Sequence, residues 1–325
     1  MKNKNDTTEV LHPKNQLKLF NFENLFHDFD KLFKKNKLPN TILLSGSKGV
    51  GKSTFVFHFS NYLFSRKEGL SYALEDFKII DQNKSYNLVK NNLHTNFYFL
   101  ESKNSNDKVK VDQVRGLLNF ANKSSFSEDL KIILIDNAEL LNKSSANALL
   151  KIIEEPNRNT FFFIIQNKSA NFLNTIKSRC IEFKVSFTIE DKMEIFRNLA
   201  NQYTLEFNEI NSIENLHYET HGNLLKYNLG IHDYHLITQS DNLKNIYSLI
   251  KIIENDKVPD KFNFLQYFVE KFYKDICYKN MDNFNKFNNY INNYKQIINQ
   301  INNMKNFNLN EKNTLSLIRN TLPNE

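Results

Sequence analysis

The spacing of hydrophobic and polar positions changes at about residue 185. Upstream, from residue 41, short apolar runs alternate with stretches in which apolar residues recur every three or four positions. This alternation is typical of a parallel sheet covered by helices on both faces. The expected strands are Thr41–Ser45, Phe97–Glu101, Lys131–Asp136, Phe161–Gln166 and Cys180–Val185. The expected helices are Lys52–Phe64, Val111–Ala121, Ser144–Glu155 and Phe172–Ser178.

Beyond residue 185 strand signals nearly vanish and helical periodicity takes over. The expected helices are Glu190–Gln202, Asn242–Glu254, Phe262–Tyr278 and Asn283–Asn310. The last of these is rich in Asn, but its Tyr and Ile residues keep a helical spacing, so we interpret it as a helix with a biased surface. The chain therefore changes from an α/β class to an all-α class near Val185.

Composition narrows the class of protein. A hydrophobic fraction of 40% over 325 residues is sufficient for ordinary buried cores. No apolar run approaches the roughly 18–20 residues that span a bilayer, and no apolar segment follows the N-terminal residues as in a secretory signal. The two cysteines, Cys180 and Cys277, form no CxxC pair, which argues against a disulfide framework or a four-cysteine zinc site. We expect a cytoplasmic protein with no membrane segment.

The basic charge balance has two explanations. The formal net charge is +7 and the pI is about 9.0. A basic surface favours nucleic acid, because phosphate binding releases counterions. A chain this rich in Lys, Asn, Ile and Phe also points to a biased coding background, which raises the lysine content without any ligand. Charge alone leaves both explanations open.

The clearest chemical motif is a glycine-rich loop directly after the first expected strand. Residues 46–54 fit the pattern G-x-x-x-x-G-K-[ST], and a helix is expected to follow. In that setting backbone N–H groups curl toward phosphate oxygens, and the helix N-terminus adds partial positive charge. We predict that Lys52 reaches the β- and γ-phosphates of ATP and that Ser53 binds Mg²⁺. A chance Gly/Lys turn is the alternative. The predicted nucleotide-binding residues of the loop are Gly46, Gly49, Gly51, Lys52, Ser53 and Thr54.

A P-loop site needs a second acidic group at the end of a neighbouring strand. Asp136 ends the apolar run that begins at Lys131, and we predict that it holds Mg²⁺ together with Ser53. The alternative is an aspartate that only caps a helix at a strand–helix junction.

Three stretches beyond this strand narrow the family. They read DNAELL at 136–141, ANALLK at 146–151 with EEP at 154–156, and TIKSRC at 175–180. Together they resemble the AAA+ subunits of DNA clamp loaders. Residues 111–115, VDQVR, and the Leu-Pro-Asn that begins at Leu38 are similar to delta-prime subunits of the bacterial DNA polymerase III clamp loader. The resemblance covers the first 185 residues.

The resemblance implies an architecture and an activity. Residues 1–185 are expected to form an AAA+/RecA-like parallel-sheet P-loop domain, 186–230 a small helical lid, and 231–325 an all-α collar for oligomerisation. Arg179 resembles the arginine finger of the SRC motif, which reaches the γ-phosphate held by a neighbouring subunit. An ordinary surface arginine paired with a carboxylate is the alternative. Cys180 is interpreted as a small apolar residue that begins a strand.

Several positions depart from an active ATPase of this family. Asn137 stands where a glutamate polarises the attacking water, and Glu139 is expected to point elsewhere. Asn167, in preference to Gln166, is predicted to sense the γ-phosphate. The turn at 221–226 lacks the arginine of a second sensor, and Lys226 is interpreted as displaced from that place. Nucleotide binding is therefore predicted, and hydrolysis at this chain's own site is not.

Other features are interpreted as structural. The stretch Glu75–Asn87 is expected to be a polar loop where some relatives carry a zinc module, so no zinc is expected. His58 is expected on a solvated face. Phe55, Phe59 and Leu63 are interpreted as core residues and not as a base-stacking platform.

The leading hypothesis is a subunit that activates its neighbour. It would present Arg179 to a partner ATPase and help load the sliding clamp onto primed DNA, in a complex with other clamp-loader subunits. The alternative is a motor ATPase that hydrolyses ATP at its own P-loop, against which Asn137 and the missing sensor arginine argue. A small-molecule P-loop kinase would leave the helical C-terminal third unexplained.

Overall fold

The computed structural model describes residues 12–101, 109, 111–122, 130–167, 173–203, 219–233, 242–255, 261–307 and 309–323. The chain divides into two compact units, Met1–Lys226 and Tyr227–Glu325. The first unit contains the sheet and the phosphate-binding loop. The secondary-structure elements described in the second unit are all helices.

A five-stranded sheet organises the first unit. Its order is β2-β3-β4-β1-β5, and every pair of neighbouring strands is parallel. All five expected strands are confirmed, each with ends within two residues of the prediction. The strands are β1 (Thr41–Gly46), β2 (Phe97–Leu100), β3 (Lys131–Ile135), β4 (Thr160–Asn167) and β5 (Ile181–Lys184).

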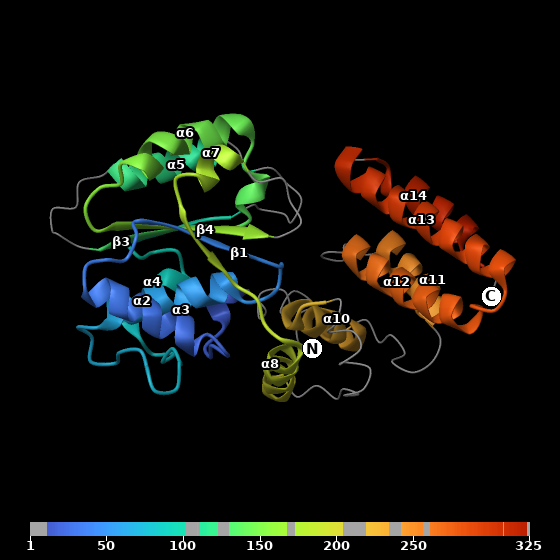
Figure 1. Ribbon diagram of the computed structural model, residues 1–325, viewed down its shortest axis with the longest axis horizontal. Coiled ribbons are helices and arrows are strands. Elements are labelled where there is room, and N and C mark those ends of the chain that lie inside the picture. Colours follow the sequence, from blue (N-terminus) through green and yellow to red (C-terminus); the bar gives the residue numbers. More distant parts are fainter. Residues whose placement is uncertain are drawn as a thin grey trace. The chain divides into compact units, whose positions relative to one another are not determined.

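Helices cover both faces of this sheet, as Figure 1 shows. One face carries α2 (Glu23–Lys34), α3 (Lys52–Ser65) and α4 (Lys84–Lys90). The other carries α5 (Val111–Asn122), α6 (Lys143–Glu154) and α7 (Asn174–Lys177). The expected helices form α3, α5, α6 and the shorter α7; the first residue of the expected fourth helix, Phe172, lies outside the described part.

Alternation along the central strands divides the core in two. In β1, Leu44 joins the cluster under α2 and α3, whereas Leu43 joins the cluster under α5 and α6. Successive side chains of a strand point to opposite faces, so a strand buried on both sides is apolar at every position. This is why β3 and β4 appear in the sequence as continuous apolar runs.

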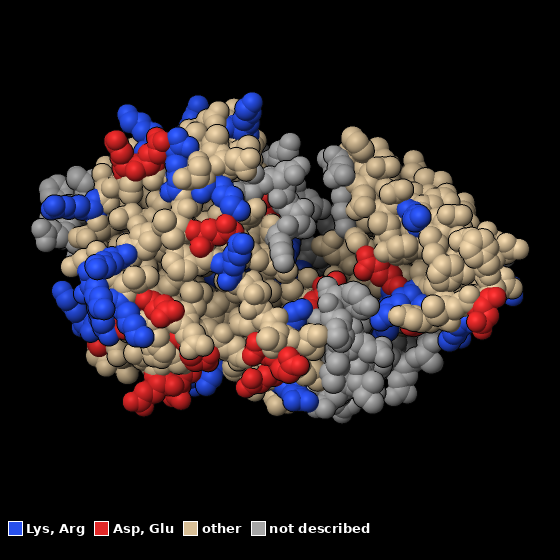
Figure 2. Space-filling model, viewed as in Figure 1, with Lys and Arg blue, Asp and Glu red and all other residues tan. Residues whose placement is uncertain are grey.

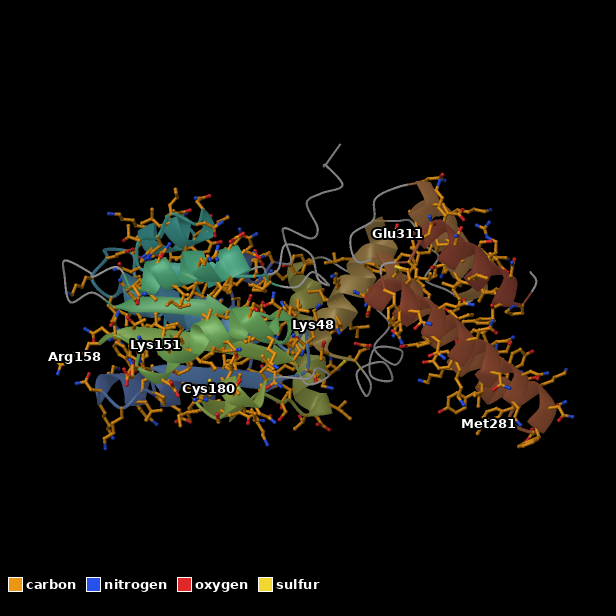
Figure 3. The ribbon with its side chains drawn as sticks, turned by 90° about the horizontal axis from the view of Figure 1, so that it is seen from above. Lys48, Lys151, Arg158, Cys180, Met281 and Glu311 are labelled. Carbon is orange, nitrogen blue, oxygen red and sulfur yellow. The ribbon has the colours of Figure 1, made fainter. Side chains whose placement is uncertain are left out.

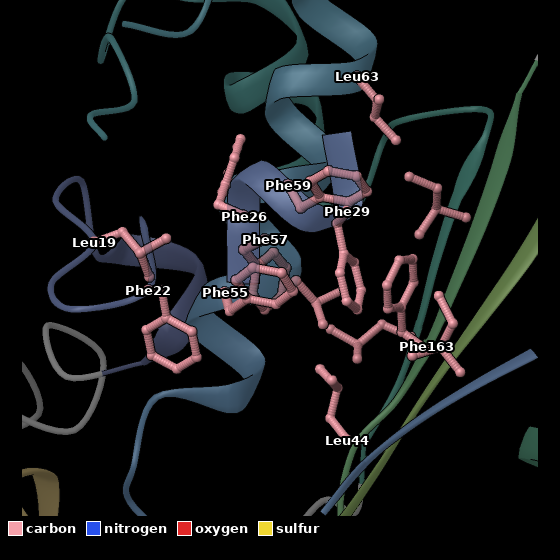
Figure 4. Packing of buried hydrophobic residues seen from close by; sticks show 14 of the residues in the cluster. Leu19, Phe22, Phe26, Phe29, Leu44, Phe55, Phe57, Phe59, Leu63 and Phe163 are labelled. Atoms are coloured by element: carbon pink, nitrogen blue, oxygen red, sulfur yellow. The ribbon is translucent and has the colours of Figure 1, made fainter. Parts of the chain in front are cut away.

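Phenylalanine dominates the core on the α2–α3 face (Figure 4). Phe26 and Phe29 from α2 are wholly buried against Phe55 and Phe59 from α3. Their rings meet edge to face, with centroids 5.2 to 6.1 Å apart, a favourable arrangement for aromatic quadrupoles. The interpretation of Phe55, Phe59 and Leu63 as core is confirmed.

The expected polar loop at 75–87 is only partly a loop. Asn83 is fully buried and caps α4, because its side chain accepts a hydrogen bond from the backbone N–H of Tyr86 at 2.7 Å. The same side chain accepts from Asn61 of α3 at 2.8 Å and donates to the carbonyl of Leu70. A buried asparagine with these partners ties the segment to α3. Neither α2 nor α4 was expected from the periodicity.

Helices α8 (Ile189–Gln202) and α10 (His221–Asp233) follow the sheet. The first matches the expected helix and begins with a capping box, in which Thr188 and Asp191 each bond the other's backbone N–H. The part of α10 up to Lys226 belongs to the first unit. We call α8 and residues 219–226 the lid segment.

The described helices of the second unit share one apolar core. They are the end of α10, α11 (Asn242–Asn255), α12 (Lys261–Lys279), α13 (Phe284–Phe307) and α14 (Glu311–Thr321). Leu249, Leu265, Ile297 and Ile318 are fully buried in this core. The Asn-rich segment is helical as expected, but it ends at Phe307, and Asn310 caps a further helix that was not predicted. None of the described helices is long and apolar enough to cross a membrane.

Acidic and basic side chains mix over most of the face in Figure 2. Basic side chains gather at the left margin, where α2 ends. The last turn of α2 carries Lys31 and Lys34, and Lys35 and Lys37 follow it. Both explanations of the basic charge, a nucleic-acid surface and a biased coding background, fit this patch.

Candidate nucleotide-binding site

The phosphate-binding loop connects β1 to α3, as the motif predicts. Gly49 and Gly51 have φ angles of 87° and 91°, a conformation that residues with a Cβ rarely adopt. Gly51 is the N-cap of α3, so the first N–H groups of that helix have no partner within the helix and face the loop. Ser53 and Thr54 lie in the first turn of α3.

Lys52 is folded back onto its own loop. Its Nζ donates to the carbonyls of Gly46 and Ser47 at 3.0 and 2.8 Å, and to Oδ1 of Asn167 at 3.0 Å. Burial lowers the pKa of Lys52 from 10.5 to about 8, although the carboxylates of Asp136 and Glu139 oppose this shift. Burial therefore disfavours the protonated form of the Lys52 side chain, and an anionic ligand bound beside it would favour that form again.

Ser53 and Asp136 meet as predicted. The hydroxyl of Ser53 donates to Oδ2 of Asp136 at 2.7 Å, and the backbone N–H of Asn137 donates to Oδ1 at 2.7 Å. Burial raises the pKa of Asp136, and these two hydrogen bonds oppose the rise. A hydroxyl and a carboxylate oxygen side by side fit Mg²⁺, which takes oxygen ligands and usually completes its shell with water and phosphate oxygens.

Asn167 ends β4 next to these groups, and Glu139 reaches it. Nδ2 of Asn167 donates to Oε1 of Glu139 at 2.6 Å and to Oδ1 of Asn137 at 2.9 Å. The expectation that Glu139 points elsewhere is wrong. Asn137 adopts a left-handed conformation, with φ of 50°, and begins the short 3₁₀ helix Ala138–Leu140 that turns Glu139 back toward β4.

The lid segment docks onto the phosphate-binding loop. The hydroxyl of Thr220 donates to the carbonyl of Lys48 at 2.8 Å, and the N–H of Gly222 donates to the carbonyl of Gly49 at 3.2 Å. A Cβ on Gly222 would overlap that carbonyl. Thr220 was not predicted from the sequence, where only the glycine of this turn indicates a close backbone approach.

Lys226 lies within electrostatic reach of the loop. Burial, and then the charge of Lys48, lower the pKa of Lys226 from 10.5 to about 8. From the sequence, Lys226 is interpreted as displaced from the position of the second sensor. The structure brings its charge close to that of the P-loop residue Lys48.

Arg179 lies away from this site. It precedes β5, and its guanidinium pairs with Oε1 of Glu154, with Nε and a terminal nitrogen each 2.5 Å from that oxygen. A terminal nitrogen also donates to the carbonyl of Thr175 at 2.8 Å. This is the carboxylate pairing that the surface-arginine alternative expects. Neighbouring Cys180 is partly buried, and burial raises the pKa of its thiol to about 12, which suits a structural role.

His58 does not lie on a solvated face. Its side chain projects from α3 and is fully buried. Nδ1 lies 2.9 Å from the hydroxyl of Tyr72, and Nε2 lies 3.0 Å from the carbonyl of Gln16. A neutral imidazole satisfies both if Nε2 donates and Nδ1 accepts. Burial lowers the pKa of His58 to about 3.

Within the described residues, no group of three or more His, Cys, Asp or Glu side chains is arranged to hold a metal ion.

The sheet order, the loop after β1 and the carboxylate after β3 define a P-loop domain of the AAA+ class. Residues 22–188 match the family model described as DNA polymerase III, delta subunit. The match covers half of the chain, which therefore belongs to this family and is delta-prime-like.

Curated relatives support this assignment. The DNA polymerase III subunit delta' of Pseudomonas aeruginosa is 31% identical over 140 residues, which are 43% of this chain and 41% of that protein. The delta' subunit of Buchnera aphidicola subsp. Baizongia pistaciae is 26% identical over 240 residues, 70% of this chain and 69% of its own. The DNA polymerase III subunit gamma of Buchnera aphidicola subsp. Acyrthosiphon pisum is 24% identical over 236 residues, 70% of this chain and 60% of its own. The chain thus spans less than half of the first relative's length and about two thirds of the others'.

Proposed function

We propose that this chain is a subunit of the DNA polymerase III clamp loader, that it binds ATP with Mg²⁺ at its own P-loop, and that it acts on ATP held by a neighbouring subunit through Arg179. It would thereby help load the sliding clamp onto primed DNA in the cytoplasm. Its second unit would serve as the collar through which the other subunits assemble.

The position of Arg179 carries the proposal. In the parallel sheet, Ile42 of β1 is level with Ile181 of β5, so Arg179 lies near the beginning of β1. Its own phosphate-binding loop begins at Gly46, at the other end of that strand. About six residues of strand, or about 20 Å, separate Arg179 from Gly46, which is farther than an arginine side chain reaches.

Figure 3 shows Lys48 of the loop at one end of the sheet, and Cys180, next to Arg179, farther along the sheet and away from the loop. The Arg179 guanidinium is therefore too far from its own loop to contact a phosphate bound there, and the phosphate that it contacts would be one bound by another subunit. Its charge is permanent and its planar fork suits phosphate oxygens, so a neighbour's γ-phosphate could replace Glu154 as its partner.

A motor ATPase remains the second candidate. Glu139 places a carboxylate beside Asn167, in the region where a γ-phosphate sensor is predicted, and a gamma subunit is among the relatives. Against it, Asn137 offers only an amide where a catalytic base is needed, and an amide does not take up a proton.

Turnover of a reconstituted clamp-loader complex tests the proposal. Arg179→Ala is expected to lower ATP hydrolysis by a large factor, up to about the 10³–10⁵ of other trans-acting arginines. Arg158→Ala is the matched control, because Arg158 is an exposed arginine just before β4 at the same edge of the sheet. Glu154→Gln keeps Arg179 but removes its paired charge, so turnover should stay at or above the wild-type rate.

The isolated chain supplies the comparison between the two candidates. We expect it to bind ATP without appreciable hydrolysis. Hydrolysis by the isolated chain, together with loss of the complex's turnover in Lys52→Ala but not in Arg179→Ala, would favour the motor ATPase.

A further inference from the structure

Asn167 lies between two groups of opposite hydrogen-bonding character. The Lys52 ammonium can only donate, and it lies 3.0 Å from Oδ1 of Asn167. The Glu139 carboxylate can only accept, and it lies 2.6 Å from Nδ2. The two partners leave the amide a single orientation, with its oxygen toward Lys52 and its nitrogen toward Glu139.

This orientation uses every donor that Asn167 has. One hydrogen of Nδ2 goes to Glu139, and the other goes to Oδ1 of Asn137 at 2.9 Å. The backbone N–H of Asn167 donates to the second oxygen of Glu139 at 3.3 Å. A residue that senses a γ-phosphate must donate to it, and Asn167 has no donor left.

Glu139 holds the Asn167 amide in this orientation. Its carboxylate takes both the backbone and the side-chain N–H of Asn167, and hydrogen bonds to a charged acceptor are about twice as strong as neutral ones. When a β-phosphate draws Lys52 away, these bonds still hold the nitrogen of the amide toward Glu139. The side of Asn167 that faces the loop then presents an oxygen.

We propose that Glu139 makes this P-loop prefer a nucleoside diphosphate to a triphosphate, by holding Asn167 with its oxygen toward the phosphate site. This inference rests on the proposed nucleotide binding and adds a preference to it. The loop amides and Lys52 can serve the β-phosphate of either nucleotide. The γ-phosphate would meet the oxygen of Asn167 and, behind it, the negative charge of Glu139, both of which repel it.

Affinities of the full-length chain for two nucleotides test the preference. Dissociation constants for MgADP and for a non-hydrolysable Mg–ATP analogue can be measured by competition against a fluorescent nucleotide. The wild type is expected to bind ADP about tenfold more tightly, the scale of one hydrogen bond to a charged group. In Glu139→Gln the ratio should move by about tenfold toward the triphosphate, because a glutamine can donate and lets the Asn167 amide turn over.

A second background tests the route through Asn167. In Asn167→Ala, the further change Glu139→Gln should alter the ratio much less than it does in the wild type, since the oriented amide is gone. An equal tenfold change in both backgrounds would overturn the positioning role. Glu75→Gln is the charge-matched control, at an exposed residue away from the loop, and its ratio should equal that of the wild type.

Two other outcomes distinguish failure of the diphosphate preference from failure of nucleotide binding at the P-loop. If the wild type binds ADP and the ATP analogue equally, and Glu139→Gln does the same, the preference is refuted while nucleotide binding stands. If folded wild-type chain binds neither nucleotide, nucleotide binding at the P-loop fails first, and the preference falls with it. Circular dichroism of each variant establishes that it is folded.

Discussion

The backbone N–H of Gly222 donates to the carbonyl of Gly49 at 3.2 Å, which joins the lid segment directly to the phosphate-binding loop. Thr220 adds a second bond, from its hydroxyl to the carbonyl of Lys48 at 2.8 Å. Because both lid groups donate, they occupy carbonyls of the loop and leave its N–H groups for phosphate. The contact therefore orients the loop without competing for the ligand.

Gly222→Ala is expected to weaken this contact. The added Cβ would overlap the carbonyl of Gly49, which is backbone and has little room to move. Overpacking of this kind typically costs about 1–3 kcal/mol of folding free energy. Denaturant unfolding measures the loss, and faster hydrogen exchange at the start of α10 would show where it arises.

Gly69→Ala is the control for the lid contact. A Cβ at Gly69 meets no atom within 4 Å, and its φ lies outside the left-handed region. The free energy of unfolding should then stay within about 0.5 kcal/mol of the wild type. If Gly222→Ala is equally neutral, the lid segment does not dock on the loop in solution.

Nucleotide binding is expected to be coupled to proton uptake near pH 8. The pKa values of Lys52 and Lys226 are lowered from 10.5 to about 8, so both side chains are partly neutral there. Phosphate charge favours the ammonium form, and each lysine takes up a fraction of a proton as the ligand binds. The uptake should be small at pH 7 and should grow toward pH 9. Calorimetry in buffers of different ionisation enthalpy measures it.

Arginine variants assign this uptake to each lysine. Lys52→Arg and Lys226→Arg keep the positive charge but remove the titration, because a guanidinium stays protonated. Each should abolish its own share of the uptake. Without ligand, the same lowered pKa values mean that the unfolded chain binds more protons between pH about 8 and 10.5, so stability rises with pH across that window. No difference between the arginine variants and the wild type would contradict the lowered pKa values.

The strands and the phosphate-binding loop could be predicted because their signals are local. A strand buried on both faces is a continuous apolar run, and the P-loop pattern lies between such a run and a helix. Ser53 and Asp136 could be paired from sequence, since parallel strands end at one edge of the sheet, although β4 lies between β1 and β3. Their hydrogen bond of 2.7 Å confirms this pairing.

Glu139 could not be placed because its direction depends on one backbone angle. Asn137 turns the chain with φ of 50°, and the next three residues form a 3₁₀ turn. The alternation of side-chain directions within β3 therefore stops before Asn137, and it does not predict the direction of Glu139. Thr220 was missed for a related reason, since its partner, Lys48, lies 172 residues away.

His58 was wrongly expected on a solvated face because α3 has no such face there. The helix packs against the sheet on one side and beneath α2 and the preceding segment on others, so Phe57, His58 and Phe59 are all buried in succession. A polar residue in such a helix must find its partners within the protein. Tyr72 and Gln16 supply them.

The same burial makes His58 a source of acid sensitivity. Its pKa falls from 6.5 to about 3 in the folded chain, so between these pH values the unfolded chain binds a proton that the folded chain excludes. Stability is therefore full above pH 6.5 and falls as the pH drops, at up to about 1.4 kcal/mol per pH unit for this one group. Unfolding free energies at pH 7 and pH 5 measure the slope. His58→Gln keeps hydrogen-bonding groups without titrating and should flatten it, leaving contributions from His94 and His221, because burial lowers both pKa values, that of His221 to about 4. His27→Gln, at an exposed position, should leave the slope at its wild-type value. A slope that is the same in all three proteins would mean that His58 is not held neutral by burial.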